Sequence, residues 1–275
     1  MNKLQRYLTS GHFDVEGWLR PLAIQGIVAL SKAQVFRGVT GSACEIGVHH
    51  GRLFILLHLL TQPHEHSAAW DLFDNQDENT DASGLGDRSR FEANLSRHGC
   101  DVGRIRIFAA NSLSLTKEKI LDGAQGSARL FSVDGGHTAD ITANDIKLAA
   151  KVLTNGGILL LDDCFNESWP GVAEGTCRCL ADHEFHLIPF AIFGNKLAFT
   201  TDVESADFYR RALNALPTIL FKQTAQFWGH QVLTLVPIKK NVLRRFFSQL
   251  SLWEAIKNTA FGQWLKYSAL PRWLR

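Results

Sequence analysis

At 275 residues the chain is long enough for one large α/β domain with additions at its ends. Hydrophobic residues make up 45% and charged residues 20% of it, a composition that excludes a disordered protein and a fibre. The first residues lack the apolar run of a signal peptide, and no stretch reaches the roughly 18 apolar residues of a membrane span. The five cysteines lack the spacing of zinc or redox sites and predict reduced thiols. We therefore expect a cytoplasmic protein.

The N-terminal segment, residues 1–40, is expected to be a helical lead-in, because helix formers dominate residues 10–40. From residue 42 on, short apolar runs alternate with stretches of helical spacing. The expected strands are SACEIGV, AAWDLF, RIRIFAA, RLFSVDGG and GILLLDDC, which lie within residues 42–164. This alternation predicts a doubly wound α/β domain, in which a mostly parallel sheet carries helices on both faces.

A different pattern follows residue 184. HLIPFAIF and KLAFTT flank Gly194 and Asn195, which predict a two-residue hairpin turn, and QVLTLVP predicts a further strand. The parallel sheet is therefore expected to end with an antiparallel strand, and we place the main domain at residues 41–238. Residues 239–275 are expected to form a basic helical tail, because they hold eight Lys or Arg and one Glu in a chain whose net charge is only +2.

The loop after the first expected strand reads CEIGVHHGR. In a doubly wound sheet, ligands bind at the carboxyl ends of the strands, so Glu45, Gly47 and Gly51 are candidate ligand-binding residues. Glycine lets the backbone approach a ligand closely. A dinucleotide-binding fold would carry G-x-G-x-x-G here, whereas an acidic loop suits a cationic ligand without phosphate. Glycine turns of this kind also occur in α/β proteins without any ligand, and that interpretation stays open.

Polar residues follow the next two expected strands. Asp71 ends the apolar run of AAWDLF, where a carboxylate is placed to accept hydrogen bonds from ribose hydroxyls. Asn111 and Ser112 follow RIRIFAA, where short polar side chains are placed to contact a nucleoside base. For Asp71 the alternative is a solvated side chain at the end of a strand.

Three carboxylates follow the fourth and fifth expected strands. Asp134 ends the fourth strand, and Asp162 and Asp163 end the fifth. At one edge of a sheet these carboxylates would repel one another unless they bind a cation or share a proton, and an all-oxygen ligand set suits Mg²⁺. His137 follows Asp134 on the same loop and is the candidate general base, while a packing histidine at the start of a helix is the alternative.

At these residues the chain resembles the class I S-adenosylmethionine-dependent methyltransferases, over roughly residues 40–200. CEIGVHHG resembles their first motif, AAWDLF their ribose-binding strand end, and residues 131–164 their fourth and fifth strands. Within that class, D-G-x-H followed by G-G-x-x-x-x-D-D is similar to the metal-dependent sugar O-methyltransferases, such as the macrocin and mycinamicin enzymes. The resemblance implies a Rossmann-like sheet of seven strands whose last strand runs antiparallel.

The resemblance also implies a site and an activity. Asp134, Asp162 and Asp163 would hold Mg²⁺, and His137 would take the proton of a sugar hydroxyl that receives the methyl group. Some members carry an Asp two residues after the first metal ligand, where this chain has Gly136, so His137 is the remaining candidate base. The acceptor would be a small molecule or a glycan. The residues that would bind S-adenosylmethionine are Glu45, Gly47, Gly51, Asp71, Asn111, Ser112 and Asp134.

Two segments have no firm assignment. The polar stretch between Phe73 and Phe91 either covers the substrate or is solvated. The basic, aromatic-rich residues 239–275 either bind peripherally to the inner face of a membrane, contact a partner, or pack on their own domain. Because the basic charge is confined to this tail, we expect no nucleic-acid partner. The sequence does not decide between a monomer and a homo-oligomer.

Other functions stay open at this stage. A metal-independent methyltransferase would use His137 and the Asp pair only to orient its acceptor, and it would be insensitive to chelators. A nucleotide-binding oxidoreductase on a similar fold would need the G-x-G-x-x-G motif that this chain lacks. A non-catalytic, membrane-associated protein would leave the clustered carboxylates without a purpose.

Overall fold

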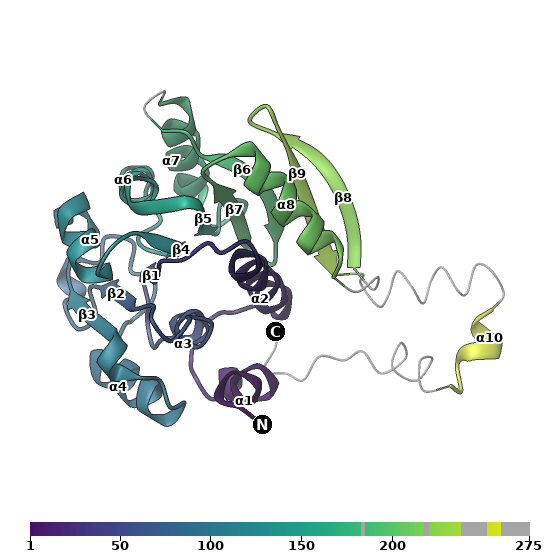
Figure 1. Cartoon of the computed structure of the whole chain (residues 1–275), viewed down its shortest axis with the longest axis horizontal. Coiled ribbons are helices and arrows are strands. Elements are labelled where there is room, and N and C mark those ends of the chain that lie inside the picture. Colours follow the sequence, from purple (N-terminus) through teal and green to yellow (C-terminus); the bar gives the residue numbers. More distant parts are fainter. Residues whose placement is uncertain (183–184, 217–219, 238–251, 260–275) are drawn as a thin grey trace. The chain divides into compact units, whose positions relative to one another are not determined.

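The computed structural model in Figure 1 describes residues 1–182, 185–216, 220–237 and 252–259. The chain forms two compact units. The first comprises Met1–Leu216 and Gln223–Leu235, and the second comprises Pro217–Lys222 and Val236–Arg275. The N-terminal helices therefore belong to the same unit as the sheet. The domain boundaries that we place at residues 40 and 238 stay a prediction.

Nine strands form one sheet in the order β3-β2-β1-β4-β5-β7-β6-β9-β8. Strands β1 to β5 run parallel, whereas β7 runs antiparallel to both of its neighbours, β5 and β6. The predicted doubly wound α/β fold with an antiparallel strand is therefore confirmed. The strands are β1 (Ser42–Ile46), β2 (Ser67–Asp71), β3 (Ile105–Ala109), β4 (Ala128–Val133), β5 (Leu153–Asp162), β6 (Ile188–Phe193), β7 (Lys196–Thr200), β8 (Leu220–Phe227) and β9 (His230–Pro237).

Two strands extend the sheet beyond the seven that the resemblance implies. β9 pairs with β6 in parallel, and β8 is hydrogen-bonded to β9. The turn between them consists of Trp228 and Gly229, whose φ angles of 50° and 75° are those of a type I′ hairpin turn. QVLTLVP predicts β9, but LFKQTAQF did not suggest β8, because its polar residues interrupt the apolar pattern.

Helices cover both faces of the sheet. In Figure 1, α5, α6 and α7 lie on one side of the central strands, and α2 and α3 lie on the other. Helix α8 contacts α2 and β6. The helices of the first unit are α1 (Lys3–Thr9), α2 (Pro21–Phe36), α3 (Arg52–Leu59), α4 (Arg88–Arg97), α5 (Lys117–Ala124), α6 (Ala139–Val152), α7 (Pro170–Ala181) and α8 (Val203–Asn214).

Helix α6 shows how the local sequence defines one element. The Thr138 side chain caps its first turn by accepting a hydrogen bond from the Ile141 N–H, and Asp140 adds a negative charge near the positive end of the helix dipole. Ile146 and Ala149 fall on its buried face, as their spacing predicts. The capped start matters for the site, because the residues just before Thr138 form the loop after β4.

One hydrophobic cluster joins the central strands to α5, α6 and α7. Trp70 of β2 stacks on Phe131 of β4 with an angle of 4° between the rings, and on Phe108 of β3 with 9°. Ile120 of α5 and Ile146 of α6 close this cluster from the helix side. Close packing of this kind leaves few rotamers to the side chains of each strand. The carboxyl ends of β1, β2, β4 and β5 are therefore held in fixed positions.

The second unit contains α10 (Trp253–Ile256). The predicted contact of residues 239–275 with a membrane or a partner concerns residues that, apart from 252–259, lie outside the described ones, and it stays a prediction. Within the described ranges, no helix combines the length and the apolar character needed to cross a membrane.

Candidate active site

The loop after β1 lies against the end of β4. Gly47 has a φ of 80°, and a Cβ atom at this position would lie 1.8 Å from the Asp134 carbonyl oxygen, so only glycine fits. Gly51 is the N-cap residue of α3 and has a φ of 89°, and a Cβ there would lie 2.6 Å from the Phe91 ring. The two glycines thus have a packing role, which neither requires nor excludes a ligand-binding role. Glu45 is buried on β1.

Asp71, at the end of β2, holds this loop through its carboxylate. One oxygen accepts hydrogen bonds from the backbone N–H groups of Val48 (2.7 Å) and His49 (2.9 Å), and the other accepts one from Phe73 (2.6 Å). A carboxylate offers about four acceptor positions, so these bonds leave little capacity for ribose hydroxyls in this conformation. Binding of ribose by Asp71 stays a prediction.

Asn111 and Ser112 follow β3, as predicted, and both contact neighbouring elements. The Asn111 amide donates a hydrogen bond to Glu78 (2.8 Å), and its oxygen accepts one from the backbone of Leu113 (3.0 Å). The Ser112 carbonyl accepts a hydrogen bond from Asn144 of α6 (3.1 Å). These residues lie at the carboxyl edge of the sheet, where a nucleoside base is expected.

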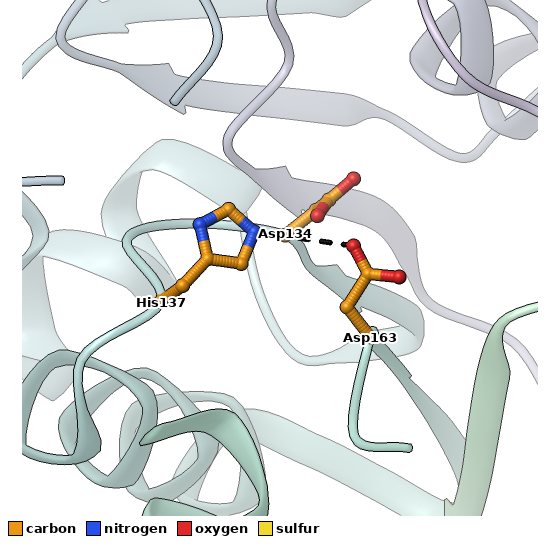
Figure 2. A group of neighbouring side chains, drawn as sticks. All are labelled: Asp134, His137 and Asp163. Atoms are coloured by element: carbon orange, nitrogen blue, oxygen red, sulfur yellow. Dashed lines mark ion pairs between the residues drawn. The ribbon is translucent and has the colours of Figure 1, made fainter. Parts of the chain in front are cut away.

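Asp134, His137 and Asp163 come together at the ends of β4 and β5, as Figure 2 shows. One ligand atom from each lies within 4.8 Å of those of the other two, and the His137 Nε2 atom is 3.9 Å from a carboxylate oxygen of Asp163. The His137 and Asp163 side chains are 12% and 19% exposed, so a ligand can reach them. The sequence predicted this convergence for all three residues.

Asp162 lies outside this group of three, although its carboxylate contacts that of Asp134, and its role as a metal ligand stays a prediction. One of its oxygens forms an ion pair with the ammonium group of Lys196, and the other accepts a hydrogen bond from Asn195 (3.0 Å). Lys196 is only 1% exposed and lies directly opposite Asp162 in the pairing of β5 with β7. The sequence signal for this buried partner is a single charged residue, Lys196, before the apolar residues Leu197, Ala198 and Phe199.

Burial and neighbouring charges shift the pKa values of Asp134 and Lys196. Burial raises the pKa of Asp134 well above its ordinary value, and the neighbouring Asp162 raises it further, whereas Lys196 lowers it. Burial lowers the pKa of Lys196, but Asp162 and Asp134 more than offset this effect, so its pKa lies above the ordinary value. Lys196 is therefore charged, and the remaining carboxylates favour a proton or a second cation.

Asp134, Asp163 and His137 form a donor set that fits a divalent cation. Two partly buried carboxylates that face each other repel unless a positive charge lies between them. Carboxylate oxygens are hard ligands that suit Mg²⁺ or Mn²⁺, and the imidazole nitrogen lies close enough to act on a molecule bound beside such an ion. The chemistry of the donor set is thus consistent with the predicted metal.

The polar loop after β2 supplies further residues that sequence reasoning did not identify. The Asp81 carboxylate lies 3.0 Å from His137 Nδ1, and the Ser83 hydroxyl also lies 3.0 Å from it. Burial raises the pKa of Asp81, but hydrogen bonds donated by Ser83 and His137 outweigh this effect and bring the pKa below its ordinary value. The Trp169 ring stacks on the imidazole at 4.2 Å. His137 is therefore held from two sides.

Asp145 of α6 is a second carboxylate that the sequence did not single out. It is fully buried, and its Oδ2 atom lies beneath Gly135, where a Cβ would approach it to 2.6 Å. Within the described part of the chain, this oxygen has no hydrogen-bond partner. Burial raises the pKa of Asp145 to about 7. The loop that carries Asp134 and His137 thus rests on a carboxyl group that binds a proton near neutral pH.

Residues 44–164 match the family model of a methyltransferase domain. This chain carries a methyltransferase domain. The predicted resemblance to S-adenosylmethionine-dependent methyltransferases is therefore confirmed, and the matched residues hold every predicted site residue. No curated protein matches the chain in sequence.

Two solved structures share the fold of the methyltransferase domain. The calicheamicin methyltransferase CalS11 has a TM-score of 0.51 and 16% identity, with 72% of this chain and 91% of that chain covered. The O-methyltransferase NovP has a TM-score of 0.52 and 14% identity, with 66% of this chain and 79% of that chain covered. At such identities the likeness establishes the fold, so the chemistry of the site must be argued from its residues.

Replacing Lys196 by methionine is expected to lower the free energy of unfolding by about 3–5 kcal/mol, because it leaves Asp162 charged and buried without its partner. Urea denaturation at neutral pH measures this difference. The double variant K196M/D162N should recover part of the loss, and K32M, at an exposed position of α2, should change stability by about 0.5 kcal/mol or less. A K196M variant as stable as wild type would contradict the role of this ion pair.

The raised pKa of Asp145 predicts a pH-dependent effect of D145N. The folded chain holds the Asp145 proton up to about pH 7, whereas the unfolded chain loses it near pH 3.8, so this residue makes wild type less stable as pH rises through that range. D145N removes the penalty: it should match wild type at low pH and exceed its unfolding free energy by up to about 4 kcal/mol at about pH 8. Urea denaturation at both pH values, with the exposed D140N as control, checks this; equal pH slopes would refute it.

Proposed function

We propose that this enzyme transfers a methyl group from S-adenosylmethionine to a hydroxyl oxygen of a sugar, with Mg²⁺ held by Asp134 and Asp163 and with His137 as the general base. The observation that carries the proposal is the convergence of two carboxylates and the Nε2 atom of an imidazole at the carboxyl edge of the sheet. A hydroxyl group bound at the two carboxylates through a cation would lie beside a nitrogen that can accept its proton.

The residues at the ends of β1, β2 and β3 would bind S-adenosylmethionine. The glycine loop lacks the phosphate-binding pattern and instead has Glu45, one of whose carboxylate oxygens has no hydrogen-bond partner within the described residues. An acidic edge of this kind suits a cationic sulfonium ligand. Beside its three backbone hydrogen bonds Asp71 keeps about one acceptor position, through which it would hold one ribose hydroxyl. Asn111 with Ser112 would contact the base. When bound, S-adenosylmethionine supplies an electrophilic methyl group.

Three residues of this chain would carry the proton and charge chemistry. A bound Mg²⁺ lowers the pKa of a hydroxyl that it contacts. Asp134 and Asp163 would hold that ion. Asp162 would stay in its ion pair with Lys196 and keep the end of β5 in position. His137 would accept the hydroxyl proton at Nε2 as the oxygen forms its bond to the methyl carbon. Positioning of the two reactants by this rigid edge would supply most of the rate enhancement.

Two observations support a sugar as the acceptor: the sequence patterns at the site and the aromatic residues around it. The D-G-x-H and G-G-x-x-x-x-D-D patterns resemble those of sugar O-methyltransferases. Phe165, two residues after Asp163, is 56% exposed, and Trp169 lies against His137. An exposed aromatic ring such as that of Phe165, beside a polar centre, provides a face on which the C–H side of a sugar ring can pack.

A metal-independent methyltransferase is the second candidate, and one observation favours it. Lys196 already provides a positive charge among Glu45, Asp134 and Asp162, which partly neutralises the acidic edge without a metal ion. In that case Asp163 and His137 alone would orient and deprotonate the acceptor hydroxyl. Methyl transfer by this route would persist in EDTA.

Isothermal titration of the full chain with S-adenosylmethionine and S-adenosylhomocysteine tests the cofactor, with NAD as control. We expect both sulfur ligands to bind and NAD not to bind, because the loop after β1 has no phosphate-binding glycine pattern. Absence of binding by both sulfur ligands, or binding by NAD instead, would overturn the proposed function.

Titration with Mn²⁺, followed by electron paramagnetic resonance, tests the metal site without any acceptor. D134N and D163N should each weaken Mn²⁺ binding about tenfold or more, because each removes a charged oxygen ligand. D140N is the matched control: its carboxylate is 87% exposed on α6, outside the site, and the variant should bind Mn²⁺ like wild type. Wild type that binds no Mn²⁺ but still binds S-adenosylhomocysteine would instead support the metal-independent candidate.

A further inference from the structure

The polar loop after β2 crosses the carboxyl edge of the sheet and contacts the ends of two other strands. Glu78 accepts a hydrogen bond from Asn111, which follows β3. Asp81 and Ser83 contact His137, which follows β4. The loop thus connects the residues proposed to contact the nucleoside with His137, the proposed general base. Neither the methyltransferase family match nor the sequence patterns assign this loop a role.

His137 makes two separate contacts with one carboxylate oxygen of Asp81. Its backbone N–H donates a hydrogen bond to Asp81 Oδ2 (2.5 Å), and its ring Nδ1 atom lies 3.0 Å from the same oxygen. The Asp81 side chain, which supplies the acceptor oxygen, is only 10% exposed, so water competes little for these bonds. Trp169 stacks on the ring with an angle of 20°, which restricts its rotation.

The hydrogen atoms around Nδ1 can be counted from the neighbouring groups. Ser83 has one hydroxyl hydrogen, and its Oγ atom donates it to Asp81 Oδ1 (2.5 Å). Toward Nδ1, 3.0 Å away, the Ser83 oxygen can then only accept. The ionised Asp81 carboxylate is also an acceptor only. Since both polar neighbours of Nδ1 are acceptors, Nδ1 must carry the hydrogen, and the neutral ring keeps its lone pair on Nε2.

We propose that Asp81 is the positioning residue for His137, fixing the imidazole as the Nδ1–H tautomer so that the unprotonated Nε2 atom faces Asp134 and Asp163. This inference rests on the proposed function, in which Nε2 takes the proton of the acceptor hydroxyl. The hydroxyl O–H bond breaks, its proton goes to Nε2, and the oxygen bonds to the methyl carbon as the carbon–sulfur bond breaks with its electron pair left on sulfur. The Asp81 carboxylate then stabilises the imidazolium that forms.

A merely structural contact would behave differently. If Asp81 only anchored the loop, its bond to the His137 backbone N–H would suffice, and the ring would be free to adopt either tautomer. A histidine side chain in water prefers the Nε2–H form, in which Nε2 cannot accept a proton. The tautomer of His137 therefore separates the two roles, and it can be measured without an acceptor substrate.

Nitrogen-15 NMR of the full chain with labelled histidine tests the proposal at about pH 8, where an unperturbed imidazole is neutral. The His137 signals are those absent from H137Q. In wild type we expect the Nδ1–H tautomer, favoured about tenfold or more by the bond to a charged acceptor. D81N should lower this tautomer ratio about tenfold, because an amide can donate to Nδ1 as well as accept from it.

Two matched variants complete the experiment. S83A keeps the Asp81 carboxylate and should keep the Nδ1–H tautomer. D77N lies on the same loop at an exposed position and should leave the His137 signals unchanged. Wild type with the Nε2–H tautomer, or a folded D81N variant with the wild-type ratio, would overturn the proposal. The wild-type measurement decides alone if D81N does not fold.

Titration of the same samples with S-adenosylhomocysteine separates the two levels of the argument. Binding together with an unchanged tautomer ratio in D81N would refute the role of Asp81 and leave the proposed methyl transfer standing. No binding by wild type would refute the proposed function, whatever the tautomer of His137.

Discussion

The ion pair between Lys196 and Asp162 is the constraint on which the site depends. Parallel strands bring Glu45, Asp134 and Asp162 to one edge of the sheet, where Glu45 and Asp162 are buried and Asp134 is partly buried, and their negative charges would repel strongly. Lys196 supplies the compensating charge from β7, directly opposite Asp162 in the sheet. Because β7 runs antiparallel to β5, its first residue lies at the carboxyl end of β5. The antiparallel strand is therefore part of the electrostatics of the site as well as of the fold.

The two adjacent carboxylates at the end of β5, Asp162 and Asp163, have different surroundings because the backbone turns between them. Asp162 ends the strand and points into the buried ion pair, whereas Asp163 has a φ of 58° and presents its carboxylate to His137. A left-handed conformation is tolerated by aspartate better than by most residues. A single Asp–Asp pair thus provides one carboxylate for structural charge balance and one for ligand chemistry, held in place by Asn195, which bonds both side chains.

The site is assembled from loops that follow strands of the sheet, and each loop is held by another. Asp71 fixes the backbone of the glycine loop, Gly47 lets that loop contact Asp134, and Asp81 reaches His137 from the loop after β2. Loops supported in this way keep catalytic groups in fixed geometry, which is how a rigid sheet can serve chemistry at its edge. Movement of the loop after β2 would change the surroundings of the imidazole directly.

The sequence by itself determined the doubly wound fold, the antiparallel strand and the residues at the strand ends, because each is encoded by local apolar runs and the polar residues that stop them. It also anticipated that Asp134, His137 and Asp163 converge. Only the tertiary structure revealed the ion pair of Lys196 with Asp162, the contact of Asp81 with His137 and the buried Asp145. Each of these depends on which residues of separate elements meet, or on the orientation of a buried side chain, and the local pattern around each residue does not determine either.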